Sequence, residues 1–277
     1  MRATGERPIA GVTPDALVAL HRSGYLEAAR RMGGGRVLDI GCGTGLGASH
    51  LQGEGRTTFG ADYDLGALAR AKGGDGAALV PVCADGARLG FRDRAFDYVV
   101  SSHIIEHFED PSLHVAEIGR VLAPGGTAFI FTPNRPADLE NPFHLHLFEP
   151  PELRELLGRY FRDVQVGGHD ATETVKRDFG ERRAAARRLL ALDVFDLRHR
   201  LPRRWYIAGY GLATRVFYRL QAGRHAQGAT GIDEGHFFIT EGVDETTLSL
   251  FATARGPLGR PSPTGSGPGS AAASTGR

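Results

Sequence analysis

A glycine-rich segment offers the clearest chemistry in this 277-residue chain. The apolar run at 37–40, which contains Asp39, leads directly into Gly41-Cys42-Gly43-Thr44-Gly45. Glycines let a backbone approach a ligand closely, and the start of a following helix would offer free N–H groups. The segment is not the dinucleotide fingerprint G-x-G-x-x-G, because Leu46 stands at the sixth place. An acid inside the preceding run suits a ligand that carries a cationic amine better than a pyrophosphate.

Further polar residues stand where later apolar runs end. Asp62 ends the second run, 23 residues after Asp39, and a carboxylate at that place can accept hydrogen bonds from both hydroxyls of a ribose. Asp85 follows the third run, and Ser101 and Ser102 end the fourth.

These marks together resemble the class I S-adenosylmethionine-dependent methyltransferases, in a form similar to type 11 and to a subgroup of glycan and secondary-metabolite pathways. By this resemblance Asp39 faces the methionine part of S-adenosylmethionine, Asp62 the ribose and Asp85 the adenine amino group. The chain departs from the family at Asp64, where a serine is common. The predicted cofactor-binding residues are Asp39, Gly41, Cys42, Gly43, Gly45, Asp62, Tyr63, Asp85, Gly86, Ser101 and Ser102.

The string His103-Ile104-Ile105-Glu106-His107 reads H-x-x-E-H, as in inverted zinc peptidases. On a helix, residues at i, i+3 and i+4 share a face, which would allow a metal site. Ubiquinone-pathway O-methyltransferases resemble the string more closely, but they have an acid in place of His103, above a magnesium ion. His103 in place of that acid argues against a hard cation, and we predict no metal ligands. Three interpretations of the string stay open: it shapes the pocket, it supplies a general base through His103 or His107, or, as the least favoured, it binds a metal.

A second candidate base follows the fifth apolar run. The order Thr132-Pro133-Asn134, then Asn141-Pro142-Phe143-His144, resembles the glycan and secondary-metabolite subgroup. A histidine at the ligand-binding edge of the sheet can take a proton from a hydroxyl near neutral pH. The alternative is that His144 only caps a turn. The predicted catalytic residues are thus His103, His107 and His144.

The elements that must position these residues alternate along the chain. Apolar runs at 36–40, 57–61, 78–82, 96–101 and 127–131 predict buried strands, and segments 46–52, 65–72 and 112–122 between them predict helices. This alternation is typical of a doubly wound α/β sheet with right-handed crossovers. The family resemblance implies a Rossmann-like sheet of seven strands whose last strand is antiparallel, with a helical insertion before that strand.

We divide the chain accordingly. We predict a flexible N-terminus at 1–14, the cofactor-binding core at 15–168, a basic helical insert or lid at 169–246, the last core strand at 247–255, and a disordered tail rich in Gly, Pro and Ser at 256–277. Ten Lys and Arg residues against four acids in 176–204 suggest a lid for an anionic or lipid-linked sugar, or peripheral contact with an anionic membrane. A solvated helix face is the alternative.

Composition excludes several classes. The net charge of +1 argues against nucleic acid as a partner, and two cysteines cannot form a disulfide framework. The sequence lacks a secretory signal and a membrane-spanning run, so we expect a cytoplasmic protein.

The function that we predict is methyl transfer to a small-molecule acceptor, most simply a hydroxyl of a sugar or secondary metabolite. The alternatives are carbon methylation of a quinone-like ring and a non-catalytic module that binds the cofactor or a partner.

Overall fold

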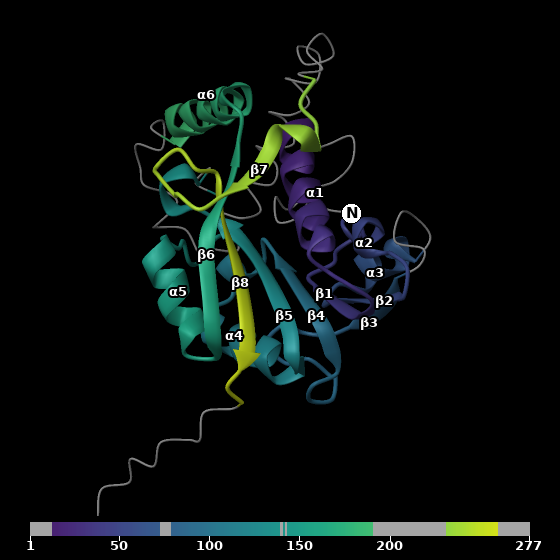
Figure 1. Ribbon diagram of the computed structural model, residues 1–277. Helices are drawn as coiled ribbons and strands as arrows, with labels where there is room; N and C mark the ends of the chain where they lie inside the picture. Colours follow the sequence, from purple (N-terminus) through teal and green to yellow (C-terminus); the bar gives the residue numbers. More distant parts are fainter. Residues whose placement is uncertain (1–12, 73–78, 139–140, 142, 191–230, 260–277) are drawn as a thin grey trace, which may run out of the picture.

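The chain folds around one eight-stranded sheet with the order β3-β2-β1-β4-β5-β8-β6-β7 (Figure 1). The computed structural model describes residues 13–72, 79–138, 141, 143–190 and 231–259. The first five strands are parallel, whereas β8 lies antiparallel between β5 and β6, and β7 pairs antiparallel with β6. The strands are β1 (Gly35–Ile40), β2 (Arg56–Asp62), β3 (Val80–Cys83), β4 (Phe96–Ser102), β5 (Leu122–Pro133), β6 (Phe161–Ala171), β7 (Phe237–Thr240) and β8 (Ser249–Pro257).

The predicted doubly wound α/β sheet with an antiparallel last strand is confirmed, but the predicted count of seven strands is wrong. The extra strand is β7, four residues long, at the edge of the sheet. The fifth strand is also longer than expected, because β5 begins at Leu122 and includes the Ala-Pro-Gly-Gly segment that reads as a turn in the sequence. A register shift between Phe96 and Tyr98 accommodates this irregular start.

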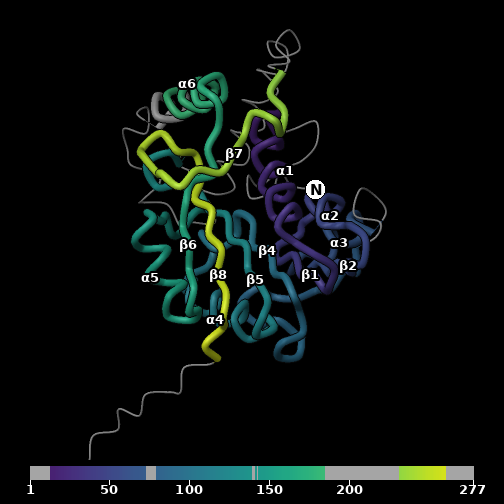
Figure 2. Tube along the Cα trace, viewed as in Figure 1, coloured from purple at the N-terminus to yellow at the C-terminus, as the bar shows by residue number. Residues whose placement is uncertain are grey.

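Both faces of the sheet are covered, and alternate residues of each strand pack on opposite sides. Leu38, Val99 and Ile130 belong to the core beneath α4 (Pro111–Val121) and α5 (Pro150–Gly158). Their neighbours Val100 and Phe131 belong to a second core, beneath α1 (Asp15–Arg30). By the same alternation Asp39 faces α1. Figures 1 and 2 show α1 on the opposite side of the sheet from α4 and α5.

Short helices connect the strands near the predicted site. These are α2 (Ala48–Leu51), α3 (Leu65–Ala71) and the single 3-10 turns η1 (Ile105–His107), η2 (Arg135–Ala137) and η3 (Glu234–His236). The Asp64 side chain caps α3 by accepting hydrogen bonds from Gly66 and Ala67. Asp110 caps α4 by accepting a hydrogen bond from the Ser112 N–H, and Pro111 follows at the first helical position.

The segment predicted as a helical insert is not wholly helical. β6 extends to Ala171, and α6 (Glu173–Leu190) follows, but β7 lies in the same segment and returns to the sheet. Residues 191–230, most of the predicted disordered tail and most of the flexible N-terminus lie outside the described residues. Within the described part of the chain, we find no helix with the length and apolar character needed to cross a bilayer.

Candidate active site

The glycine-rich turn after β1 has a backbone that only glycine adopts readily. Gly41, Gly43 and Gly45 have φ angles of 77°, 55° and 82°. A Cβ atom on Gly41 would lie 2.6 Å from the Cδ1 atom of Ile104, so a side chain there would also require Ile104 to shift. The Gly41 N–H donates to the Ala61 carbonyl across 2.7 Å, which holds the turn against β2. Ile104 thus packs the loop after β4 directly onto the turn.

Asp39 is fully buried on β1 beneath α1. The Tyr25 hydroxyl of α1 donates to its carboxylate, 3.1 Å from Oδ1 and 3.4 Å from Oδ2. Burial raises the pKa of Asp39 to about 8, although the Tyr25 hydrogen bond opposes the rise; the nearby Asp62 charge adds to it. The carboxyl group is therefore neutral at pH 7 until a cation approaches.

The Asp62 carboxylate, at the end of β2, holds the turn by a hydrogen bond to its backbone. Its Oδ2 accepts from the Gly43 N–H at 2.9 Å, and its Oδ1 accepts from the Asp64 N–H at 2.9 Å. Tyr63, predicted to bind the cofactor, is 67% exposed beside it. Cys42 is buried within the turn.

His114 on α4 is a site residue that we did not predict. It is fully buried, and its Nδ1 lies 2.9 Å from the Gly86 carbonyl oxygen while its Nε2 lies 2.9 Å from Ser101 Oγ. Because a carbonyl only accepts, Nδ1 carries the proton and Nε2 accepts from the serine hydroxyl. Burial lowers the pKa of His114 to about 4, so the ring stays neutral. It links the loop that carries Asp85, an exposed acid, to the end of β4.

The predicted catalytic histidines all line one small cavity of about 90 Å³. Apolar side chains of α1, of α6 and of Leu248, which directly precedes β8, form part of its wall. The lining residues are Leu17, Leu20, His21, His103, Glu106, His107, Pro133, Ala137, Asp138, His144, Phe179, Leu248 and Ser249. The cavity therefore lies at the carboxyl ends of β4 and β5, where open α/β sheets bind ligands.

His103 has an unusual backbone and an unpaired ring nitrogen. Its φ is 52°, a left-handed conformation that costs energy for a residue with a side chain and turns the chain sharply after β4. Its Nδ1 lies 3.7 Å from Glu106 Oε1, and its ring lies 4.5 Å from that of His21. Its Nε2 is buried with no hydrogen-bond partner among the described residues.

Glu106 is a fully buried acid, and it lay outside the predicted set of site residues. Thr132 Oγ1 donates to its Oε2 at 3.0 Å, while its Oε1 has no hydrogen-bond partner in the part of the chain that the structure describes. Burial alone would raise the pKa of Glu106, but the neighbouring His103, His107 and His144 outweigh it and lower this pKa to about 2. The site thus holds a buried negative charge.

His107 and His144 each use one ring nitrogen for a fixed contact. His107 Nδ1 lies 3.0 Å from the Phe143 carbonyl oxygen, and His144 Nδ1 lies 2.7 Å from Asp138 Oδ1. His144 Nε2 lies 3.1 Å from Asn141 Nδ2. Burial lowers the pKa of His144, but the Asp138 hydrogen bond and the charge of Glu106 outweigh it, and the net shift is upward.

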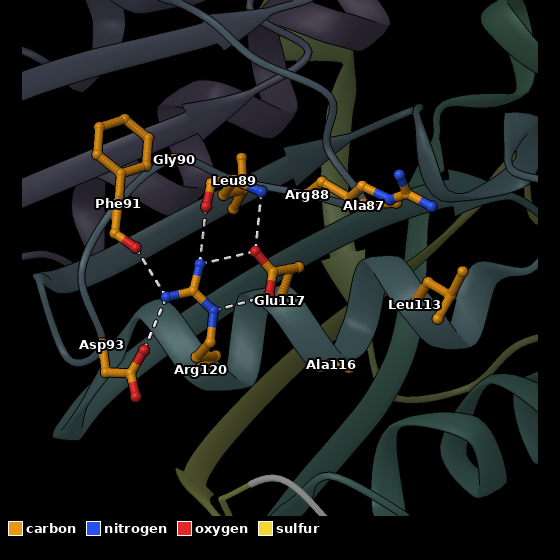
Figure 3. Close-up of a pocket in the computed structure, with 10 residues that line it drawn as sticks. All are labelled: Ala87, Arg88, Leu89, Gly90, Phe91, Asp93, Leu113, Ala116, Glu117 and Arg120. Carbon is orange, nitrogen blue, oxygen red and sulfur yellow. Dashed lines mark hydrogen bonds and ion pairs between the residues drawn. The ribbon is translucent and has the colours of Figure 1, made fainter.

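A larger hollow lies away from all of these residues. It opens between α4 and the loop at 87–93, and Arg120 spans it (Figure 3). The guanidinium donates to Glu117, to Asp93 and to the carbonyls of Leu89 and Phe91. Every charged group of this network has a partner, so its arrangement fits a structural link between α4 and the loop.

Comparisons with known proteins agree with this geometry. Residues 38–130 match the family model described as a methyltransferase domain. A probable S-adenosylmethionine-dependent methyltransferase of Mycolicibacterium smegmatis is 35% identical over 56% of this chain and 62% of its own length. A ubiquinone biosynthesis O-methyltransferase of Mesorhizobium japonicum is 36% identical over 39% of this chain and 45% of its own length. A demethylmenaquinone methyltransferase of Corynebacterium urealyticum is also 36% identical, over 34% of this chain and 39% of its own length.

The chain thus spans less than two thirds of the length of these relatives. Solved structures extend the likeness in fold. An S-adenosylmethionine-dependent methyltransferase of Thermotoga maritima, titled a possible histamine N-methyltransferase, has a TM-score of 0.54 at 16% identity, covering 86% of this chain and 91% of its own. The [4+2]-cyclase SpnF has a TM-score of 0.53 at 20% identity, with coverages of 88% and 82%. Fold alone therefore does not fix the reaction.

Three observations indicate a methyltransferase: the glycine turn, the acids at the ends of β1 and β2, and the family match. The site also suits S-adenosylmethionine, the cofactor of these relatives. The buried Asp39 carboxyl can meet its cationic amine, and the glycines of the turn leave room for a bulky ligand. Residues 38–130 match a methyltransferase domain, and the relatives and the fold together support a class I S-adenosylmethionine-dependent methyltransferase that uses S-adenosylmethionine as its cofactor.

Proposed function

We propose that this protein transfers the methyl group of S-adenosylmethionine to a hydroxyl oxygen of a small-molecule acceptor. The observation that carries the proposal is the packing of Ile104 on Gly41, because Ile104 follows His103 and so connects the glycine turn to the loop that lines the histidine cavity. A cofactor in the turn would therefore be next to an acceptor in the cavity. Alignment of this kind supplies much of the rate of methyl transfer.

The protein residues have separate tasks in this proposal. Asp39 binds the amine of the cofactor, Asp62 its ribose and Asp85 its adenine, while the glycines make room for it. When bound, S-adenosylmethionine supplies an electrophilic methyl group on its sulfonium. Leu17, Leu20 and Phe179 give the cavity apolar walls.

A histidine of the cavity accepts the proton of the acceptor hydroxyl. Among the three predicted bases, His103 has a buried Nε2 without a partner in the described chain, whereas His144 Nε2 contacts Asn141. We therefore favour His103 as the base, with Glu106 beside its other nitrogen to stabilise the imidazolium. The step moves the methyl group from sulfur to oxygen and the proton from oxygen to His103.

Calorimetric titration tests the cofactor site first. Titration of S-adenosylmethionine into wild-type protein should give micromolar binding, and Asp62→Asn should weaken it at least tenfold. Asp64→Asn is the matched control: Asp64 is adjacent, but its carboxylate caps α3, and asparagine caps helices as well as aspartate does. Absence of binding by folded wild-type protein would contradict the proposal.

Carbon methylation of a quinone-like ring is a second candidate, supported by the likeness to the demethylmenaquinone methyltransferase. An assay for S-adenosylhomocysteine release with sugars, phenols and quinols would separate the candidates, and the position of the new methyl group in the product would identify the accepting atom. Cofactor binding without release by any acceptor class would favour the non-catalytic module instead.

Among the described residues of the basic segment, α6 alone bears on the lid hypothesis, and 191–204 lie outside the described residues. Phe179 lines the cavity, and Arg183 donates to the Pro136 carbonyl, which ties α6 to the loop after β5. Lys176 and Arg182 form ion pairs with Asp170 and Asp178 rather than presenting free charge. An anionic or lipid-linked acceptor and contact with a membrane remain predictions, as does the cytoplasmic location.

A further inference from the structure

One carboxylate oxygen in the cavity has His103 Nδ1 3.7 Å away but has no hydrogen-bond partner among the described residues. Glu106 is fully buried and its Oε2 accepts from Thr132, but Oε1 finds no hydrogen-bond donor among the described residues. An unsatisfied buried carboxylate oxygen costs free energy, and native structures tolerate one mainly where a ligand or ion completes its contacts. The atom therefore points to something that binds in the cavity.

Two imidazoles stand close to that oxygen. Glu106, His107 and His144 each offer one ligand atom, and the three atoms lie within 4.8 Å of one another. Each histidine is oriented through Nδ1, one by the Phe143 carbonyl and the other by the Asp138 carboxylate. Metal-binding histidines are oriented in just this way, by a carbonyl or a carboxylate behind the ring, which leaves Nε2 for the ion.

We propose that Glu106 Oε1, His107 Nε2 and His144 Nε2 bind a divalent transition-metal ion of the Zn²⁺ class in the cavity. Two nitrogens and one carboxylate oxygen suit Zn²⁺ and its neighbours, whereas Mg²⁺ and Ca²⁺ prefer oxygen ligands throughout. Three protein ligands leave a position open towards the cavity, for water or for an oxygen of a small molecule. This departs from the sequence analysis, in which His103 in place of an acid argued against a hard cation.

Two neighbours define how the site would form. The Asn141 amide now contacts His144 Nε2 at 3.1 Å and must turn aside when the ion binds. Asp138 is a positioning residue, since it is nearly buried and its carboxylate holds the opposite nitrogen of the same ring. Loss of such a partner typically weakens metal binding by about 10- to 100-fold.

Metal titration of the full-length, untagged, chelator-treated protein tests the proposal without cofactor or acceptor. We expect one Zn²⁺ per chain with micromolar or tighter affinity, and Co²⁺ in its place should give visible absorption bands of nitrogen- and oxygen-ligated metal. Glu106→Gln and His107→Ala should each weaken binding at least tenfold and remove the Co²⁺ bands. Asp138→Asn should weaken binding while the bands persist at saturating Co²⁺.

His146→Ala is the matched control, because this histidine belongs to the same loop but contacts the Glu109 carbonyl instead. It should bind Zn²⁺ as the wild type does. Glu106→Gln keeps the shape of the side chain and an acceptor for Thr132, and its circular dichroism and melting curve should show that it folds. Wild-type binding no tighter than that of His107→Ala, or equal loss in His146→Ala, would overturn the proposal. Since no cofactor is present, that failure would leave the proposed methyl transfer untouched.

Discussion

At the scale of single residues, Asp39 couples cofactor binding to a proton. Its pKa of about 8 means that the carboxyl is neutral at pH 7 in the free protein, because burial disfavours its charge. An ammonium group placed against it would favour the ionised form, so binding must expel the proton that Asp39 carries.

We therefore expect S-adenosylmethionine to release close to one proton on binding at pH 7. Calorimetry in two buffers with different heats of ionisation measures this number. Asp39→Asn, which cannot release a proton, should bind at least tenfold more weakly and with no buffer dependence. If wild type and Asp39→Asn showed the same buffer dependence, Asp39 would not be the group that meets the amine.

His114 makes stability depend on pH. Its pKa is about 4 in the folded protein against about 6.5 in an unfolded chain. A depressed pKa contributes stability that is complete above about pH 6.5 and is lost as the pH falls towards 4. At pH 5 the loss from this residue is about 2 kcal/mol.

Denaturant unfolding at pH 7 and pH 5 measures this loss. His114→Gln should have a pH 7-to-5 decrease in unfolding free energy that is smaller than that of wild type by about 2 kcal/mol. His169, whose pKa burial lowers to about 3, contributes equally to both proteins and cancels in the difference. Equal decreases in wild type and His114→Gln would refute this role for His114.

At the scale of elements, the glycine turn and the loop after β4 pack against each other through Gly41 and Ile104. Gly41→Ala should lower stability through two causes: the left-handed φ, which costs about 1–2 kcal/mol for a residue with a Cβ, and the collision with Ile104 Cδ1. Ile104→Ala in the same chain removes the second cause only.

The double variant should therefore be more stable than the sum of the two single changes predicts, and a double-mutant cycle by denaturant unfolding gives this coupling. Gly125→Ala, at a glycine with open space around it, is the control for the substitution itself. Exact additivity would show that Ile104 does not pack on the turn in solution.

The sequence predicted the elements whose residues are buried on both faces. β1, β2 and β4 lie within two residues of the predicted ranges, because continuous apolar runs identify such strands. β7 was missed because it has only four residues at an edge, inside a stretch that looks helical. α1 went unpredicted as well: Gly24 and several polar residues interrupt its apolar pattern.

The candidate site was predictable in part for the same reason. The turn and its acids are local in sequence, so their types and spacing identify them. The cavity is not local, since its lining includes His21 of α1, Phe179 of α6 and Ser249 of β8. Nor could the sequence pair His144 with Asp138, because that contact requires the loop after β5 to fold back on itself.

At the scale of the whole molecule, the cofactor should stabilise the fold. The turn, Asp39 and Asp62 connect α1, β1 and β2, so a ligand that binds them favours the folded chain alone. Saturation at 100 times Kd adds about 2.7 kcal/mol. The melting temperature should rise by roughly 5 °C in wild type, as scanning calorimetry would measure, and by only about half as much at the same concentration in Asp62→Asn if the variant binds tenfold more weakly.

The place of β8 in the sheet has a consequence for synthesis on the ribosome. β5 and β6 do not pair with each other, because β8 lies between them in the sheet. In the chain, β8 follows β6 only after residues 172–248. Until residue 257 has left the exit tunnel, both strands present unpaired edges to other nascent chains. Translation that pauses within 172–248 would prolong that exposure, and a chaperone that shields strand edges should raise the yield of folded protein most during that interval.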